Sequence, residues 1–211
     1  MSLTVIIIIL TALISIQAFS NPQIQRQLIF HPVTMREVPG QGYRFLSHGL
    51  IHADWQHLLI NMFVLWQFGS IIEQVFTSVF GDMAGRVLYI FLYFSAIVIA
   101  SVPTYFKHLH NPSYSALGAS GATSALVFGY ILLDPWQWFV FPPLPAIVLG
   151  VAYLFYSSYM EKRGMDNIGH NAHFWGAVYG TAFTLIALSW ALPHFLSDFL
   201  QRLLEGPTSP F

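Results

Sequence analysis

Ser120 is the side chain whose setting first suggests chemistry. It lies in the segment Gly118-Ala119-Ser120-Gly121, within residues 108–133, which contain no Lys, Arg, Asp or Glu. A serine between small residues can simply allow membrane helices to pack closely. It becomes a candidate nucleophile only if a general base and hydrogen-bond donors lie at the same depth.

Three residues could supply those partners. His173 is a candidate general base, while His57 and Asn61 are one helical turn apart and would share a helix face. Two donors on one face could stabilise the anion that forms when a serine attacks a carbonyl carbon. Taken singly, each histidine is better explained as an interfacial or hydrogen-bonded structural residue, and a single buried Asn often joins two helices.

The composition places these residues in a membrane protein. Charged residues make up 8% of the 211-residue chain and hydrophobic residues 55%, whereas ordinary soluble domains have roughly 25% charged residues. Lys and Arg (8) nearly balance Asp and Glu (9), which argues against nucleic-acid binding. Because the chain has no cysteine, neither disulfides nor thiol chemistry can be involved.

Charge-free intervals near the length of a bilayer crossing predict an all-α polytopic membrane protein. The first interval could be a signal peptide, but no Lys or Arg precedes it, so we predict a span there. We predict one membrane domain, residues 1–195, and a short tail, 196–211, that begins with an interfacial helix. The six predicted spans are Leu3 to Phe19, Trp55 to Ile72, Val87 to Phe106, Leu117 to Leu133, Leu144 to Met160, and Gly169 to Leu192.

A long connection, about residues 20–54, separates the first two spans. It is too aromatic and apolar for a solvated loop, as in Leu28-Ile29-Phe30. We therefore predict a structured first loop, partly embedded in the bilayer, whose backbone groups are satisfied internally.

The order of the spans brings the polar residues together. Because successive spans alternate in direction, the N-terminal ends of the second, fourth and sixth share one face of the membrane. Those ends carry His57 and Asn61, then Ser120, then His170 and His173. Polar groups inside spans are costly and usually mark function, so this convergence favours a functional site.

Small residues predict close packing of the fourth span against the sixth. Packing alone would explain this pattern, but a short distance is also what Ser120 and His173 would need for proton transfer. The small residues recur every four positions: Gly121, Ala125 and Gly129 on one span, Gly176 and Gly180 on the other.

Three ordered motifs, at residues 57–61, 118–121 and 173–180, fall on the second, fourth and sixth spans. They are similar to the His-x-x-x-Asn, GxSG and His-x-x-Gly-x-x-x-Gly motifs of rhomboid intramembrane serine proteases. GxSG alone is a weak signal, whereas three motifs in order are specific. The chain therefore resembles this family over residues 1–192, which implies a rhomboid-like six-helix bundle.

Residues outside the three motifs extend the resemblance. Tyr43-Arg44, followed by His48 and His52, resembles the family's Trp-Arg-containing first loop, and Glu73 matches a recurrent Glu at the end of the second helix. Within the motifs, the resemblance assigns supporting roles in the backbone and packing to Gly118, Gly121, Gly176 and Gly180.

The resemblance implies a Ser-His dyad that needs no cofactor or metal. Ser120 would be the nucleophile and His173 the general base and then acid, while His57, the Asn61 amide and the backbone N–H of Ser120 would bind the oxyanion. An acyl-enzyme would form and be hydrolysed by water. Independently, every Asp lies in a connection or in the tail, which argues against a Ser-His-Asp triad.

One position departs from the family pattern. Some bacterial rhomboids carry a Tyr one turn after the nucleophile, where it stacks on the catalytic imidazole, but this chain has Ser124. The ring of His173 must therefore be supported by another residue.

The resemblance also implies the substrates and the moving parts. Substrates would be transmembrane proteins that reach the site from the bilayer, with helices that unwind near one surface. The fifth helix would be a mobile gate that begins after Pro142-Pro143, and Glu161 to Ile168 would form a cap. The sequence predicts no nucleic-acid partner and does not indicate an oligomeric state.

The family orientation predicts a bacterial inner (cytoplasmic) membrane protein whose site opens toward the extracytoplasmic side. That orientation contradicts the positive-inside tendency, because only Arg86 and Arg202 would lie inside. The basic residues outside would be Arg26, Arg36, Arg44, Lys107, Lys162 and Arg163.

Two other classes of protein compete with the protease. A histidine-ligated membrane metal or haem protein would use His48-x-x-x-His52 and His170-x-x-His173 as ligands, although the predicted spans contain no carboxylate. A transporter or a purely structural bundle would make the alignment of Ser, His and Asn a coincidence.

Overall fold

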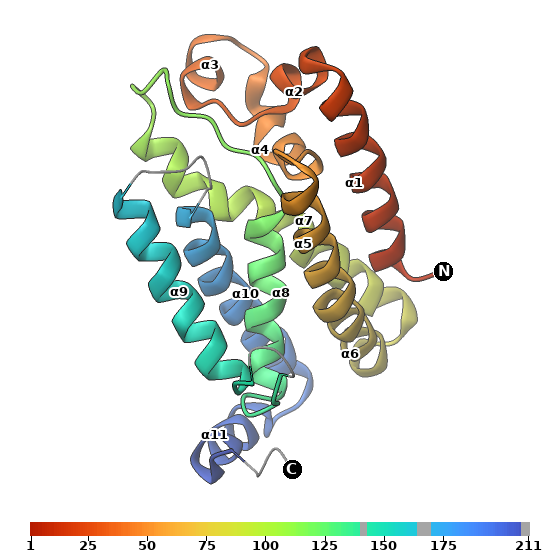
Figure 1. Cartoon of the computed structure of the whole chain (residues 1–211). Helices are drawn as coiled ribbons and strands as arrows, with labels where there is room; N and C mark the ends of the chain where they lie inside the picture. The colour runs from red at the N-terminus through yellow and green to blue at the C-terminus, as the bar shows by residue number, and fades with distance from the viewer. Residues whose placement is uncertain (140–142, 164–169, 208–211) are drawn as a thin grey trace.

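The computed structural model describes residues 1–139, 143–163 and 170–207. Within these ranges the regular structure is helical, and the only β pairing is two isolated bridges. Figure 1 shows the long helices packed side by side as a bundle, with the first-loop helices at one end. The predicted all-α membrane fold is confirmed.

Each of the six predicted spans contains a helix. The second span differs most from its predicted bounds. Its helix does not end at Ile72 but continues to Phe80 through a short π-helical segment, η3 (Leu65–Gly69). Among the residues that the structure describes, four helices are long and apolar enough to cross a membrane, whereas two further apolar helices are shorter. The long four are α1 (Leu3–Ser20), the continuous rod α5 (Trp55–Val64), η3 and α6 (Ser70–Phe80), α7 (Asp82–Lys107) and α10 (His170–Ala191). The shorter two are α8 (Ser120–Leu133) and the apolar part of α9 (Ala146–Arg163), which is Ala146–Tyr159.

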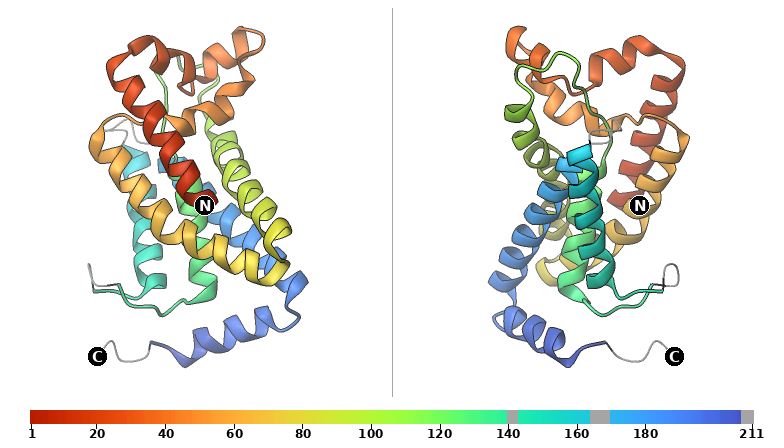
Figure 2. Two further views of the ribbon diagram at one scale, coloured as in Figure 1. Left: turned by 90° about the vertical axis from the view of Figure 1, so that its right-hand side faces the viewer. Right: turned by 60° about the vertical axis from the view of Figure 1, so that its left-hand side comes forward.

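The first loop is structured, as predicted, and consists of a chain of short helices. Side-chain hydrogen bonds hold the loop together, since Arg44 is buried and donates to carbonyl oxygens of Gln41, Arg26 and Ile29. Figure 2 shows α11 (Phe195–Glu205) across the opposite end of the bundle. The loop elements are α2 (Pro22–Leu28), α3 (Pro32–Glu37), η1 (Gln41–Tyr43), α4 (Arg44–Ser47) and η2 (His48–Leu50).

The fourth helix begins later than the sequence suggested. We predicted a start at Leu117, but α8 begins at Ser120 and has 14 residues, which is about 21 Å of helix. Gly118 has a φ of 115° and interrupts any helix before it. A short helix therefore starts below the end of the bundle and has Ser120 as its first residue.

The segment before α8 is non-helical but its backbone is paired. Phe30 and Ala116 exchange two N–H···O bonds of 3.0 Å, and the Gly118 N–H donates to the His48 carbonyl at 2.9 Å. Non-helical backbone at membrane depth needs such internal partners. The first loop thus holds the chain that leads into Ser120.

The predicted close packing of α8 against α10 is confirmed. A Cβ on Gly176 would lie 2.1 Å from the Gly121 carbonyl oxygen, and one on Gly180 would lie 2.1 Å from that of Ala125. Only glycine permits this approach, because backbone atoms on the facing helix cannot turn aside. The contact fixes the register between Ser120 on α8 and His173 on α10.

Candidate active site

Four of the side chains expected to converge line one cavity. A cavity of about 490 Å³ between α5, α8, α9 and α10 is lined by Ser120, His173, His57 and Asn61. Most of its other walls are apolar or aromatic. No direct hydrogen bond joins Ser120 to His173 among the described residues, although such bonds often tighten only when substrate binds.

His52 anchors the backbone just before Ser120. Its Nε2 accepts the Ala119 N–H at 3.4 Å, so its Nδ1 carries the proton and donates to the Ser15 hydroxyl at 3.0 Å. Ser15 in turn donates to the Leu50 carbonyl. Burial, with a smaller contribution from His57, lowers the pKa of His52 to about 3, against the opposing effect of Asp54. A neutral imidazole therefore connects α1, the first loop and the start of α8.

His48 is also neutral and bound to the first loop. Its Nδ1 lies 2.8 Å from the Arg44 carbonyl oxygen, which can only accept, so Nδ1 carries the proton. Burial lowers the pKa of His48 to about 4, although the hydrogen bond to Arg44 acts in the opposite direction. His48 and His52 thus bind protein groups, and both ring nitrogens of His52 are used in this way.

His57 lies directly over Gly118. A Cβ at Gly118 would be 2.7 Å from the His57 ring, so glycine is required there for space as well as for its positive φ. The Nδ1 of His57 accepts a long, 3.5 Å bond from the Ala53 N–H. The proton is consequently on Nε2, where it can be donated toward the cavity.

Asn61 is held so that its amide has a defined orientation. Its Nδ2 donates to the His57 carbonyl at 2.9 Å, and its Oδ1 accepts the Thr123 hydroxyl at 3.2 Å. The second N–H of the amide is not used by these bonds and the residue lines the cavity. Thr123 was not singled out from the sequence, although it follows Ser120 by one turn of α8.

The imidazole of His173 is supported from α9. The Ser157 hydroxyl lies 3.2 Å from its Nδ1, and the Tyr153 ring stacks on it with centroids 5.3 Å apart and planes 25° apart. Ser124, the residue that departs from the family pattern, contacts the Tyr153 hydroxyl at 3.4 Å. An aromatic ring from α9 therefore takes the place that an aromatic on α8 would fill.

Neither Tyr153 nor Ser157 was predicted from the sequence. The signal was their i, i+4 spacing on an apolar span, which puts a phenol and a hydroxyl on one face. The side chain of His170 and most of the predicted cap, Glu161 to Ile168, lie outside the described residues.

Arg44 and Glu73 support the fold away from the cavity. Arg44 donates to the carbonyls of Arg26 and Ile29 and ties the first loop together. The Glu73 carboxylate accepts four hydrogen bonds at the start of α1, including the N–H groups of Leu3 and Thr4. It thereby satisfies donors that a helix N-terminus leaves unpaired.

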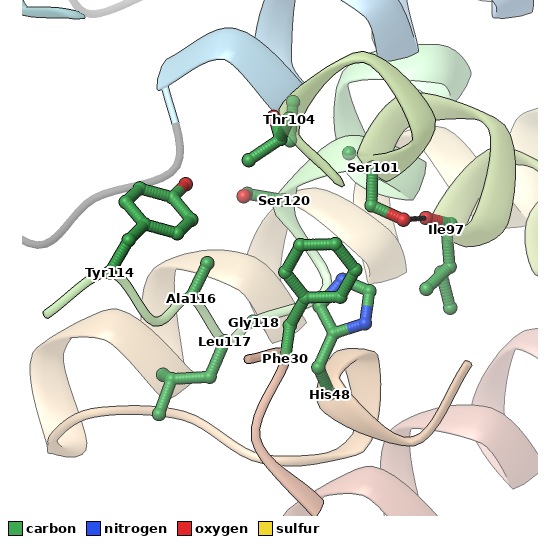
Figure 3. A pocket seen from close by; sticks show the side chains of 12 residues that line it. Phe30, His48, Ile97, Ser101, Thr104, Tyr114, Ala116, Leu117, Gly118 and Ser120 are labelled. Carbon is green, nitrogen blue, oxygen red and sulfur yellow. Dashed lines mark hydrogen bonds between the residues drawn. The ribbon is translucent and has the colours of Figure 1, made fainter. Parts of the chain in front are cut away.

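A second, small cavity adjoins Ser120 on the side of α7 (Figure 3). Its volume is about 20 Å³, which is room for one water molecule. His48, Ser101 and Thr104 contribute polar groups to its wall. The Ser101 hydroxyl lies within hydrogen-bond distance of two carbonyl oxygens of its own helix, those of Ile97 and Val98.

The chain is similar to known proteins of one family. Residues 39–190 match the Rhomboid domain. RHOMBOID-like protein 12, mitochondrial, of Arabidopsis thaliana is 28% identical over 165 residues, covering 72% of this chain and 46% of that protein. Rhomboid-related protein 1 of Caenorhabditis elegans is 25% identical over 170 residues, covering 77% of this chain and 44% of that protein.

This chain thus spans about half the length of the curated relatives that it matches. The domain match, by contrast, covers more than half of the chain and includes the first-loop Arg44 and the helices that carry Ser120 and His173. The chain therefore belongs to the rhomboid family.

Proposed function

We propose that this protein is an intramembrane serine endopeptidase that cleaves transmembrane segments of membrane proteins. The observation that carries the proposal is the single cavity shared by Ser120, His173, His57 and Asn61 at the start of a short membrane helix. A nucleophile, a base and two donors converge there from three spans, which structural packing alone does not require.

In the proposed reaction, the Ser120 hydroxyl attacks the scissile carbonyl carbon and passes its proton to Nε2 of His173. The negative charge that develops on the carbonyl oxygen is stabilised by the Nε2–H of His57, the unused N–H of Asn61 and the backbone N–H of Ser120. The α8 N-terminus adds its positive end. One donor of this kind is typically worth about 3 kcal/mol of barrier.

Collapse of the tetrahedral intermediate breaks the peptide bond. His173 then gives its proton to the leaving amine, and the new amino terminus departs while Ser120 keeps the acyl group as an ester. Water attacks this ester with His173 again as base. The 20 Å³ cavity beside Ser120 has room for that water, and Ser101 and Thr104 contribute polar groups to its wall.

The apolar walls of the large cavity favour a substrate segment from the bilayer over a soluble peptide. The proposed partners are therefore transmembrane proteins and the lipid around them. The location in a bacterial inner membrane, with the site open to the extracytoplasmic side, stays a prediction; the two relatives named above are from eukaryotes.

The test is cleavage of a single-span model substrate by purified protein in lipid vesicles. Wild type should cleave, and Ser120→Ala and His173→Ala should each lose activity by at least about 10³-fold. Ser78→Ala, an exposed serine on α6, is the matched control and should keep full activity.

A fluorophosphonate probe provides a second readout that needs no cognate substrate. It should label wild type and Ser78→Ala but not Ser120→Ala. Cleavage by the Ser120→Ala variant would show that the proposed Ser-His dyad is wrong. Loss of wild-type activity with a chelator would indicate a metal site instead.

A further inference from the structure

Two side chains of helix α9, Ser157 and Tyr153, contact the imidazole of His173. Ser157 is fully buried, and its Oγ lies 3.2 Å from Nδ1. Tyr153, one turn earlier, covers the ring face. The two residues occupy one face of α9 because they are four positions apart.

We propose that Ser157 is a positioning residue that sets the tautomer of His173, with Tyr153 fixing the plane of its ring. This inference rests on the proposed function. A general base must present a lone pair at Nε2, so Nδ1 must carry the proton. The Ser157 hydroxyl provides an acceptor for that Nδ1–H in a buried site where unpaired donors are costly.

The same acceptor serves after proton transfer. When Nε2 takes the proton from Ser120, the ring becomes an imidazolium with two N–H donors, and its Nδ1–H bond to Ser157 becomes charge-assisted. Ser157 is thus a neutral counterpart of the carboxylate that orients a triad histidine. It stabilises the cation less than a carboxylate would, but it brings no buried negative charge into the membrane span.

Tyr153 restrains the ring in the remaining direction. A hydrogen bond at Nδ1 still allows the ring to swing about that contact, whereas a stacked aromatic face limits the swing. The Tyr153 hydroxyl is itself held by Ser124 on α8 at 3.4 Å. The base is therefore complete only while α9 remains packed on both α8 and α10.

The first variant to test is Ser157→Ala, with the exposed neighbour Ser158→Ala as matched control. The expected result for Ser157→Ala is a roughly tenfold fall in kcat, with KM unchanged. The acidic limb of the kcat profile should shift to lower pH, because the imidazolium has lost an acceptor. Ser158→Ala should match wild type, and Ser157→Thr should restore most of the kcat because it keeps the hydroxyl.

Tyrosine variants test the second contact. Tyr153→Leu removes the ring and should lower kcat about tenfold, whereas Tyr153→Phe keeps the ring and should stay within about threefold of wild type. Phe155→Leu removes an aromatic ring from the exposed side of the same helix and should change nothing.

A readout without turnover separates this inference from the proposed function. In ¹⁵N-histidine spectra, with His173 assigned by difference from His173→Gln, wild type should show the Nδ1–H tautomer and Ser157→Ala should show a mixture. A wild-type kcat, pH profile and tautomer in Ser157→Ala would overturn the inference while Ser120→Ala still tests the dyad. Equal losses in Ser157→Ala and Ser158→Ala would also overturn it, because they would indicate a general disturbance of α9.

Discussion

The two sides of α8 are built in opposite ways. Toward α10, backbones touch at Gly121 and Gly176 with no room for a Cβ. Toward α9, the same helix borders a cavity of about 490 Å³. Ser120 lies at the end of α8 where both sides meet.

This difference separates two requirements of the site. The distance between nucleophile and base depends on the α8–α10 contact, which rigid backbone atoms determine. Room for a substrate depends on α9, whose contacts with α8 run through side chains. Changes on the first side should therefore cost stability, whereas changes on the second should alter binding or turnover.

The largest expected effect is at the backbone contact. Gly176→Ala places a Cβ 2.1 Å from the Gly121 carbonyl oxygen, so α8 and α10 must move apart. The free energy of unfolding should fall by about 3 kcal/mol or more, with activity lost as well, as measured by thermal unfolding in detergent. Gly42→Ala, where a Cβ meets no atom within 4 Å, is the control. Wild-type stability of Gly176→Ala would mean that this contact is not rigid.

Removal of the Glu73 carboxylate should have the next largest effect. Glu73→Ala leaves the N–H groups of Leu3 and Thr4 without their acceptor, which should cost about 2 kcal/mol of unfolding free energy. Because Glu73 is away from the cavity, kcat per folded molecule should not change. Gln74→Ala, its exposed neighbour, should leave stability unaltered. A fall in kcat without loss of stability would contradict the structural role.

Mild acid should lower the free energy of unfolding, because the two buried first-loop histidines, His48 and His52, are protonated more readily in the unfolded chain. His48 and His52 have pKa values of about 4 and about 3 in the folded protein, because burial opposes their protonation. In the unfolded chain both histidines take up protons near pH 6.5. The stability that the two neutral side chains contribute is therefore complete above that pH, and it is lost as the pH falls toward 4 for His48 and toward 3 for His52. Between pH 7 and pH 6 the two together should cost about 1.4 kcal/mol.

Thermal unfolding at a series of pH values measures this slope. His52→Gln keeps a donor and an acceptor but cannot titrate, so its stability should fall less steeply than that of wild type below pH 7. Parallel curves for the two proteins would show that His52 does not contribute.

The smallest effect on stability is expected on the side of α8 that faces the cavity. Gly150→Ala on α9 brings a Cβ to 2.6 Å from Ile131 Cδ1 and 3.2 Å from Phe128 Cζ, both ends of side chains that can move. The gain in helix propensity offsets this crowding, so the unfolding free energy should stay within about 1 kcal/mol of wild type. KM should change no more than about threefold, because Gly150 lines the cavity. A loss as large as that of Gly176→Ala would remove the distinction between the two sides.

Much of the fold was predictable because membrane helices must satisfy their own backbone and carry apolar side chains. All six spans contain helices near the predicted positions, and the glycine spacing correctly predicted which two pack most closely. The start of α8 was predicted wrongly, because Leu117 to Ala119 are as apolar as the helix that follows them. In the structure their backbone is instead hydrogen-bonded to His48 and His52 of the first loop. Those contacts join residues about 70 positions apart.

The sequence by itself determined the membrane environment, the helices and the membrane depth at which Ser120, His57, Asn61 and His173 meet. These follow from composition, from the alternation of span direction and from motif spacing, all of which are local or additive along the chain. Only the tertiary structure decided what surrounds the His173 ring. Tyr153 and Ser157 reach it because α9 packs on α8 and α10 at one particular rotation, and helix rotation depends on side-chain fit that an almost uniformly apolar sequence does not encode.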